Sequence, residues 1–287
     1  MPVPPVILRN VLPKSDLGDA AFAWFRHCSR HRRLPRVRKP RLFNDYLYRT
    51  KVDGTLSDPF RRFVSDKEFV KIYISATVGK QYICETIEVL RNSSDIDQFI
   101  PIRLPCIIKP THASGLAMIC TTESSSLDRA ALRKWLKLDY YAKTREQNYK
   151  YLTPKIIVEE FFTADGTTPP SDYKLFCFDG MPKLVQVDSN RFSKHTRNLY
   201  DTEWNLQPFS LSKPNGSVSD ERPVALAQML DVAAKLAAPF RFIRVDMYVM
   251  GNEIKVGELT NCPDGGIGKV TPPSAERFLG ALFGGVT

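Results

Sequence analysis

The sequence predicts a protein of the α+β class, because hairpin signals and amphipathic helices both occur along the chain. Apolar runs flank the short turns at Asp179-Gly180 and Gly251-Asn252, which predicts two antiparallel hairpins. Residues 126–141 and 223–238 carry apolar side chains at helical spacing. Antiparallel hairpins and helices combined in one chain are typical of the α+β class.

Length and composition exclude several classes of protein. The chain has 287 residues, enough for one large or two small domains, and 43% hydrophobic residues, which excludes disorder as the main state. No uncharged apolar run reaches the roughly 18 residues of a membrane-spanning helix, and no signal peptide is visible. The six cysteines lack C-x-x-C spacing, so we expect reduced thiols and a cytoplasmic protein.

The net charge of +10 comes from one segment. Residues 20–44 hold eight Lys or Arg and no acidic residue, whereas the rest of the chain is nearly balanced. The segment is either a helical arm that packs through Phe22, Trp24 and Phe25, or a contact for an anionic membrane surface or polymer through residues 26–41. In the second case the protein would be peripheral to the inner membrane face. Nucleic acid is not expected, because no nucleic-acid-binding signature accompanies the charge.

The first half of the chain shows one helix start and one hairpin. Ser65, followed three residues later by Glu68, predicts a capping box that begins a helix. Residues 105–110 are typical of a buried strand and residues 116–120 of a second one. The small, polar residues 111–115 between them predict a hairpin with a mobile tip.

Two helices and five strands are expected in the second half. The helices are residues 126–141 and 223–238, and the strands are residues 156–162, 173–178, 183–187, 242–250 and 254–259. Ser126 and Asp220 are the expected N-caps, and Pro239 ends the second helix.

The last hairpin carries two carboxylates whose register decides whether they meet. A two-residue turn at Gly251-Asn252 would place Asp246 opposite Gly257 and point Glu258 to the other face of the sheet. A three-residue turn, or an equivalent bulge, would place Asp246 opposite Glu258 on the face of Arg244. We expect the second arrangement, in which both carboxylates reach one ion.

Residues that can do chemistry are dispersed along the chain. Walker A, Rossmann, zincin and G-x-S-x-G motifs are all missing, so P-loop, dinucleotide, zinc-protease and α/β-hydrolase functions lack support. The remaining set consists of lysines, arginines and carboxylates, which are the groups that neutralise phosphates and hold Mg²⁺. Arg244 lies two residues before Asp246 and can stabilise an oxyanion beside the metal.

The order of these residues resembles the ATP-grasp superfamily, and more narrowly the TupA-like family associated with teichuronopeptide and other surface-polysaccharide synthesis. The resemblance covers about residues 28–265. It is carried by DKEFVK at 66–71, IIKPTHASG at 107–115, IIVEEF at 156–161, DYKLFCFDG at 172–180, VDSNRF at 187–192, RVDMY at 244–248 and GELT at 257–260.

The resemblance implies an ATP-grasp fold, in which two α+β subdomains grip ATP, and a role for each matching residue. The implied ATP-binding residues are Lys67, Lys109, His112, Ser114, Gly115, Glu159, Glu160, Phe161 and Lys174. Asp246 and Glu258 would bind Mg²⁺, Arg244 and Lys174 would be catalytic, and Asp188, Arg191, His195 and Arg197 would bind substrate. Many superfamily members carry Asn two residues after the metal Glu. Here Thr260 stands there and Asn261 follows, so a third metal ligand is left open.

The resemblance also implies a domain plan and an activity. We expect an N-terminal extension with a basic arm over residues 1–64, an N-terminal subdomain over 65–104, a lid over 105–160 and a catalytic subdomain over 161–287. The implied activity is a carboxylate–amine ligase that forms an amide through an acylphosphate, on small-molecule or glycan-linked substrates. A kinase that uses the same nucleotide site and a non-catalytic binding module are the alternatives.

Overall fold

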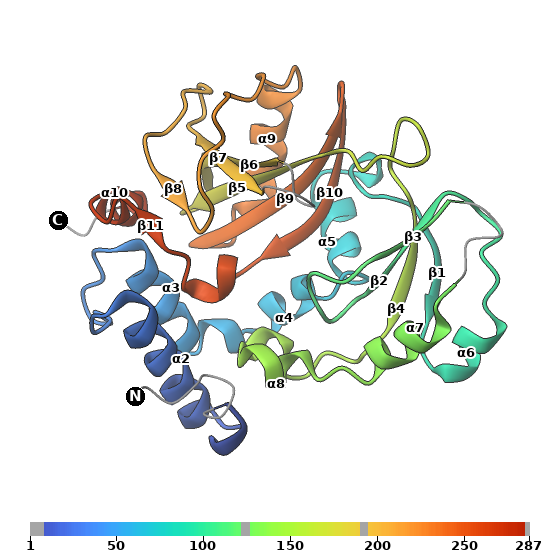
Figure 1. Cartoon of the computed structure of the whole chain (residues 1–287), viewed down its shortest axis with the longest axis horizontal. Helices are drawn as coiled ribbons and strands as arrows, with labels where there is room; N and C mark the ends of the chain where they lie inside the picture. Colours follow the sequence, from blue (N-terminus) through green and yellow to red (C-terminus); the bar gives the residue numbers. More distant parts are fainter. Residues whose placement is uncertain (1–8, 122–126, 190–194, 285–287) are drawn as a thin grey trace.

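The computed structural model describes residues 9–121, 127–189 and 195–284. It confirms the α+β class, because two antiparallel sheets stand side by side with helices packed on their faces (Figure 1). Helix α4 (Pro59–Ser65) leads into α5 (Val70–Thr77), which contacts both sheets. Ile74 of α5 enters the core of the larger sheet, and Lys71 of α5 donates to Thr86 of the smaller one.

The smaller sheet has four strands in the order β1-β4-β2-β3. These strands are β1 (Thr86–Leu90), β4 (Ile156–Glu160), β2 (Cys106–Pro110) and β3 (Met118–Cys120). The expected β2-β3 hairpin is confirmed. Helices α6 (Ser93–Gln98) and α7 (Arg129–Leu136) cover one face through a core that includes Ile108, Leu132 and Val158. Strand β1 pairs with β4, so the boundary expected at residue 104 does not separate two sheets.

The larger sheet has five strands in the order β10-β9-β5-β6-β7. These strands are β10 (Glu253–Thr260), β9 (Phe242–Met250), β5 (Ser171–Phe178), β6 (Met181–Ser189) and β7 (Thr196–Tyr200). Both expected hairpins, β5-β6 and β9-β10, are confirmed. Helix α9 (Leu226–Ala237) and α5 bury one face, and α3 (Phe43–Val52) and α10 (Ala275–Ala281) bury part of the other.

The face covered by α3 and α10 changes from apolar to charged along its strands. Phe178 lies opposite Phe242 under these helices, whereas four residues away along each strand Lys174 lies opposite Asp246. Side chains two residues apart in a strand share a face. The same strand faces therefore supply a hydrophobic core at one end and a buried charged cluster at the other.

The N-terminal helix α2 (Asp16–His31) packs against the body by part of its aromatic set. Phe22 is buried, whereas Trp24 is 47% exposed. Arg145 donates to Asp19 at 2.8 Å, with both side chains 1% exposed, and this ion pair ties α2 to the C-terminal end of α8 (Tyr140–Thr144). None of the described helices is long and apolar enough to span a membrane.

The remaining elements are short. They are η1 (Thr55–Ser57), η2 (Lys80–Tyr82), η3 (Gln147–Tyr149), η4 (Pro263–Gly266), β8 (Ser210–Leu211) and β11 (Val270–Thr271), and the last two pair with each other.

Three expected helix starts are wrong or untested. Ser65 ends α4 instead of beginning a helix, and the Asp66 carboxylate accepts the backbone N–H groups before α5. Two helices, α7 capped by Asp128 and α8 capped by Asp139, replace the single helix expected, and Ser126 lies outside the described residues. Asp220 does not cap α9, because its carboxylate accepts hydrogen bonds from β7 side chains.

Candidate active site

The register of the β9-β10 hairpin brings its two carboxylates together. Met250 pairs with Glu253, so the turn has two residues and the expected three-residue turn is wrong. The pairing then shifts by one residue in β10, and Glu258 lies opposite Asp246. The alternative of an equivalent bulge is therefore confirmed.

The bulge lies at Gly257, where a neighbouring ring leaves no room for a side chain. A Cβ atom at this position would lie 2.8 Å from Cε2 of Tyr248 on the facing strand. Glycine at this position lets β10 slip by one residue while the Tyr248 ring stays in place.

Arg244 holds Asp246 by two short hydrogen bonds. Its Nε and Nη2 atoms donate to Oδ1 and Oδ2 of Asp246, both at 2.6 Å, and Nη2 lies 3.8 Å from Oε1 of Glu258. Thr260 Oγ1 donates to the same Glu258 oxygen at 3.2 Å. Asn261 instead turns its side chain away, onto Arg61 at 2.6 Å. Of the two residues left open, Thr260 is the one beside the carboxylates.

The pKa values of the two carboxyl groups move in opposite directions. Burial raises the pKa of Asp246, and the negative charge of Glu258 adds to this effect, although Arg244 opposes it. Burial acts on Glu258 in the same direction but is outweighed by Lys67 and Arg244, which lower the pKa of this carboxyl group. Glu258, the more exposed partner, therefore ionises at a lower pH than Asp246.

Lys174 joins carboxylates from three strands. Its Nζ atom forms an ion pair with Asp172 on β5 and lies 3.8 Å from Asp246 Oδ2 on β9 and 4.0 Å from Asp188 Oδ2 on β6. Lys174 is 6% exposed, so these contacts form in a largely dry setting where charges interact strongly.

Asp188 is the centre of the expected substrate-binding set. Arg197 Nε donates to Asp188 Oδ1 at 2.7 Å, and His195 Nε2 lies 3.2 Å from the same oxygen. Burial would raise the pKa of Asp188, but Arg197 and Lys174 outweigh it and lower this pKa to about 2. The fourth residue of the set, Arg191, lies outside the described residues.

Lys67 links the loop after β2 to the β10 carboxylate. Its Nζ atom donates to the backbone oxygen of Ala113 at 2.6 Å and lies 3.7 Å from Glu258 Oε2. Burial lowers the pKa of the Lys67 ammonium, and Glu258 opposes this shift. The start of the loop is buried and attached to Lys67, whereas Ser114 and Gly115 are exposed at its tip.

Lys109 and Glu159 pair across β2 and β4 on the face that α6 and α7 leave uncovered. Lys109 Nζ lies 2.5 Å from Glu159 Oε2, and Lys71 forms a second ion pair with the same carboxylate. Burial would raise the pKa of Glu159, but the two lysines outweigh it and lower this pKa. Sequence reasoning did not select Lys71, although it follows Lys67 by four residues.

The expected hinge residues do not share one face. Glu159 pairs with Ile107 and Glu160 with Cys106, so their side chains point to opposite faces of β4. Glu160 and Phe161 line a cavity of about 260 Å³. Only Glu159 joins the lysine cluster.

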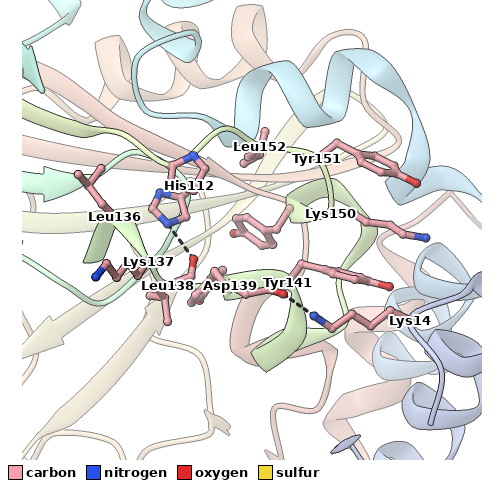
Figure 2. A pocket seen from close by; sticks show the side chains of 13 residues that line it. Lys14, His112, Leu136, Lys137, Leu138, Asp139, Tyr141, Lys150, Tyr151 and Leu152 are labelled. Carbon is pink, nitrogen blue, oxygen red and sulfur yellow. Dashed lines mark hydrogen bonds and ion pairs between the residues drawn. The ribbon is translucent and has the colours of Figure 1, made fainter. Parts of the chain in front are cut away.

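His112 also points away from the lysine cluster. Its ring is buried, and Nε2 lies 3.1 Å from the backbone oxygen of Leu138. Figure 2 shows this ring in the wall of a second cavity, of about 390 Å³, together with Lys137 and Tyr141. Of the nine expected nucleotide-binding residues, the structure therefore places four in the charged clusters, namely Lys67, Lys109, Glu159 and Lys174.

Solved structures to which the chain is similar include three ligases. The D-alanine–D-alanine ligase of Helicobacter pylori is 16% identical with a TM-score of 0.39, and the match covers 71% of this chain and 56% of that chain. The D-alanine–D-alanine ligase of Bacillus anthracis complexed with ATP is 13% identical with a TM-score of 0.38, and the match covers 69% of this chain and 54% of that chain. The ATP-grasp ligase PsnB complexed with minimal precursor, Mg and ADP is 12% identical with a TM-score of 0.43, and the match covers 83% of this chain and 65% of that chain. The chain thus spans less than two thirds of the length of each. No curated protein matches the sequence.

The family described as TupA-like ATPgrasp matches residues 50–284, well over half of the chain. This span contains both sheets and every described residue of the charged clusters above. The chain belongs to the TupA-like ATP-grasp family.

Proposed function

We propose that the protein is an ATP- and Mg²⁺-dependent carboxylate–amine ligase that releases ADP. The observation that carries this proposal is the pairing of Asp246 with Glu258 across two strands. Three cations surround the pair: Arg244 and Lys174 lie 2.6 and 3.8 Å from Asp246, and Lys67 lies 3.7 Å from Glu258. Fixed charges of this kind suit a reaction in which negative charge moves between phosphate and carboxylate groups.

In this proposal Lys67 and Lys109 bind the phosphates of ATP. Lys109 shares Glu159 with Lys71, so Glu159 keeps one lysine when Lys109 turns to a phosphate. Backbone N–H groups at Ser114 and Gly115 can approach the phosphates, because these residues are exposed and Gly115 has a φ of +77°.

The donor set of the β9-β10 pair fits Mg²⁺. The ion prefers oxygen ligands and is commonly held by one or two carboxylates together with substrate phosphates and water. Asp246 and Glu258 supply two carboxylates, and the Thr260 hydroxyl lies beside them. Among the described residues, no group of three or more His, Cys, Asp or Glu side chains is arranged to hold a metal ion by itself. Bound there, Mg²⁺ would neutralise phosphate oxygens.

The proposed reaction has two steps that this chain's cations assist. An oxygen of the substrate carboxylate attacks the γ-phosphorus, the bond to the β-phosphate oxygen breaks, and ADP leaves. The amine then attacks the acyl carbon of the acylphosphate, the C–O bond to phosphate breaks, and phosphate leaves as the nitrogen loses a proton. Arg244 and Lys174 would hold the charged oxygens in place during both steps.

The residues that would bind the carboxylate and amine substrates are assigned from their position in the candidate active site alone. Asp188 lies 4.0 Å from Lys174 and contacts His195 and Arg197. With Arg191, these residues would orient the acceptor. From the resemblance to the TupA-like family, we infer an acceptor in surface-glycan or peptide-glycan synthesis. We also infer a cytoplasmic location, where ATP is available.

The test is to incubate the full chain with ATP, Mg²⁺ and a panel of uronic and amino acids, with and without hydroxylamine. Hydroxamate formed together with ADP supports the ligase, because hydroxylamine traps an acylphosphate. Glu258→Gln should abolish hydroxamate. ADP together with a stable phosphorylated alcohol would make the protein a kinase, and ATP binding without ADP release on any member of the panel would favour a binding module.

A further inference from the structure

The loop that joins α2 to α3, residues 32–42, presents a row of exposed cations. Arg32, Arg36, Arg38, Lys39 and Arg41 are all exposed. Among the described residues, the only side chain of this loop that forms an ion pair is Arg33. Five cations therefore face solvent in ten residues with no described carboxylate to neutralise them.

Ion pairs between Arg33 and the body of the protein fix the backbone of this loop, which carries the exposed cations. Arg33 forms an ion pair with Asp45 and a second one with Glu276 at 2.9 Å. Pro35 and Pro40 further restrict the backbone. Arg33 is thus a structural residue, whereas the other five cations are free for a partner.

Two aliphatic side chains are exposed between the cations. Leu34 is 68% exposed and Val37 is 38% exposed. A polyanion in water is bound by charge and gains little from aliphatic side chains, and single-stranded nucleic acid is typically stacked on aromatic residues, which this loop lacks. A lipid surface offers both anionic headgroups and an apolar layer beneath them.

We propose that residues 32–41 dock the protein on an anionic lipid surface. The five cations lie against headgroup phosphates or carboxylates, and Leu34 and Val37 enter the boundary between headgroups and acyl chains. This docking does not depend on the proposed ligase activity, because the loop lies outside both charged clusters of the candidate active site.

The test measures sedimentation of the full chain with vesicles of phosphatidylcholine alone or with about one third phosphatidylglycerol. A charge variant carries Arg36→Gln, Arg38→Gln and Lys39→Gln. A matched control removes three exposed lysines elsewhere, with Lys183→Gln, Lys213→Gln and Lys269→Gln. Each basic residue near a membrane strengthens binding about fivefold, so the charge variant should bind anionic vesicles about 100-fold more weakly. The control should bind like the native chain.

A third variant distinguishes binding to a membrane from binding to a soluble polyanion. Leu34→Ser with Val37→Ser keeps every charge, so it should lose about tenfold in vesicle binding and elute unchanged from a heparin column. Equal binding to both kinds of vesicle, or unchanged vesicle binding by this aliphatic variant, would overturn the proposal. Unchanged thermal unfolding of each variant would show that the loop substitutions leave the fold intact.

Discussion

The two sheets carry opposite charge balances at the ends that face each other. On the four-stranded sheet, one carboxylate, Glu159, serves two lysines, Lys71 and Lys109. On the five-stranded sheet, four carboxylates share three cations. These residues are Asp172, Asp188, Asp246 and Glu258 with Lys174, Arg197 and Arg244.

The difference shows how a site with a cationic part and an anionic part can bind a ligand that carries both phosphates and a metal cation. A surplus of buried ammonium groups attracts phosphate, and a surplus of buried carboxylates attracts a metal cation, because desolvated charges are costly without partners. Lys67 connects the two sides, since it contacts both the loop after β2 and Glu258. A magnesium-bound nucleotide would satisfy both surpluses together.

The largest effect is expected when one charge is removed from the carboxylates of the five-stranded sheet. Glu258→Gln should lower ADP release by about 100- to 1000-fold, the range typical for one catalytic electrostatic group. The variant should stay folded but unfold somewhat more easily than the native protein, because it loses a partly exposed charge that Lys67 and Arg244 stabilise. Asp246→Asn is the paired variant. It should also lose activity, because it removes the carboxylate that Arg244 holds. A fully active Glu258→Gln would break the assignment.

The cationic side is tested by Lys109→Met, measured by calorimetric titration with ATP and with adenosine. Loss of one charged contact should weaken ATP binding about 10- to 100-fold and leave adenosine binding nearly unchanged. Glu159→Gln, which removes the competing carboxylate, should not weaken ATP binding. Equal losses for ATP and adenosine in Lys109→Met would place this lysine in the fold instead of at the phosphates.

The register that joins Asp246 to Glu258 is tested at Gly257. Gly257→Ala introduces a Cβ atom 2.8 Å from the Tyr248 ring, so overpacking should cost up to about 3 kcal/mol of unfolding free energy and displace Glu258. Adding Tyr248→Ala should recover part of this stability. Denaturant unfolding of both variants measures the effect, and a native-like Gly257→Ala would show that the bulge tolerates a side chain.

The hairpins were predictable because their signals are local, whereas their register was not. Asp179 and Gly180 both adopt positive φ, which their residue types favour in a two-residue turn. The bulge at Gly257 instead depends on the Tyr248 ring across the strand, which no local pattern reveals. Alternation along β4 separates the Glu159 side chain from that of Glu160, so their different surroundings follow from the strand itself.

Helix α3 escaped prediction because it buries polar residues. Asn44 and Asp45 lie on its inner face and blur the apolar pattern. Their partners, Glu276 and Arg33, come from other segments of the chain. Contacts with such distant partners cannot be predicted from a local sequence pattern. The same is true of Lys71, the second lysine that contacts Glu159, because it comes from a different element than Lys109.

The smallest expected effect tests whether the anionic side also stabilises the fold. Arg197 and Lys174 outweigh burial and lower the pKa of Asp188 to about 2, so the ionised carboxylate is more stable in the folded protein than in the unfolded chain. The resulting stability, about 2 kcal/mol, is fully present above the unfolded value near 4 and is lost as pH falls from there toward 2. Asp188→Asn should therefore unfold more easily than the native protein at pH 6, and this difference should shrink by about 2 kcal/mol on acidification.

Asp97→Asn, which removes an exposed carboxylate, should follow the native protein throughout. Denaturant unfolding from pH 6 to pH 2.5 measures both variants. A constant difference between Asp188→Asn and native would mean that Asp188 gains no charge stabilisation from its neighbours.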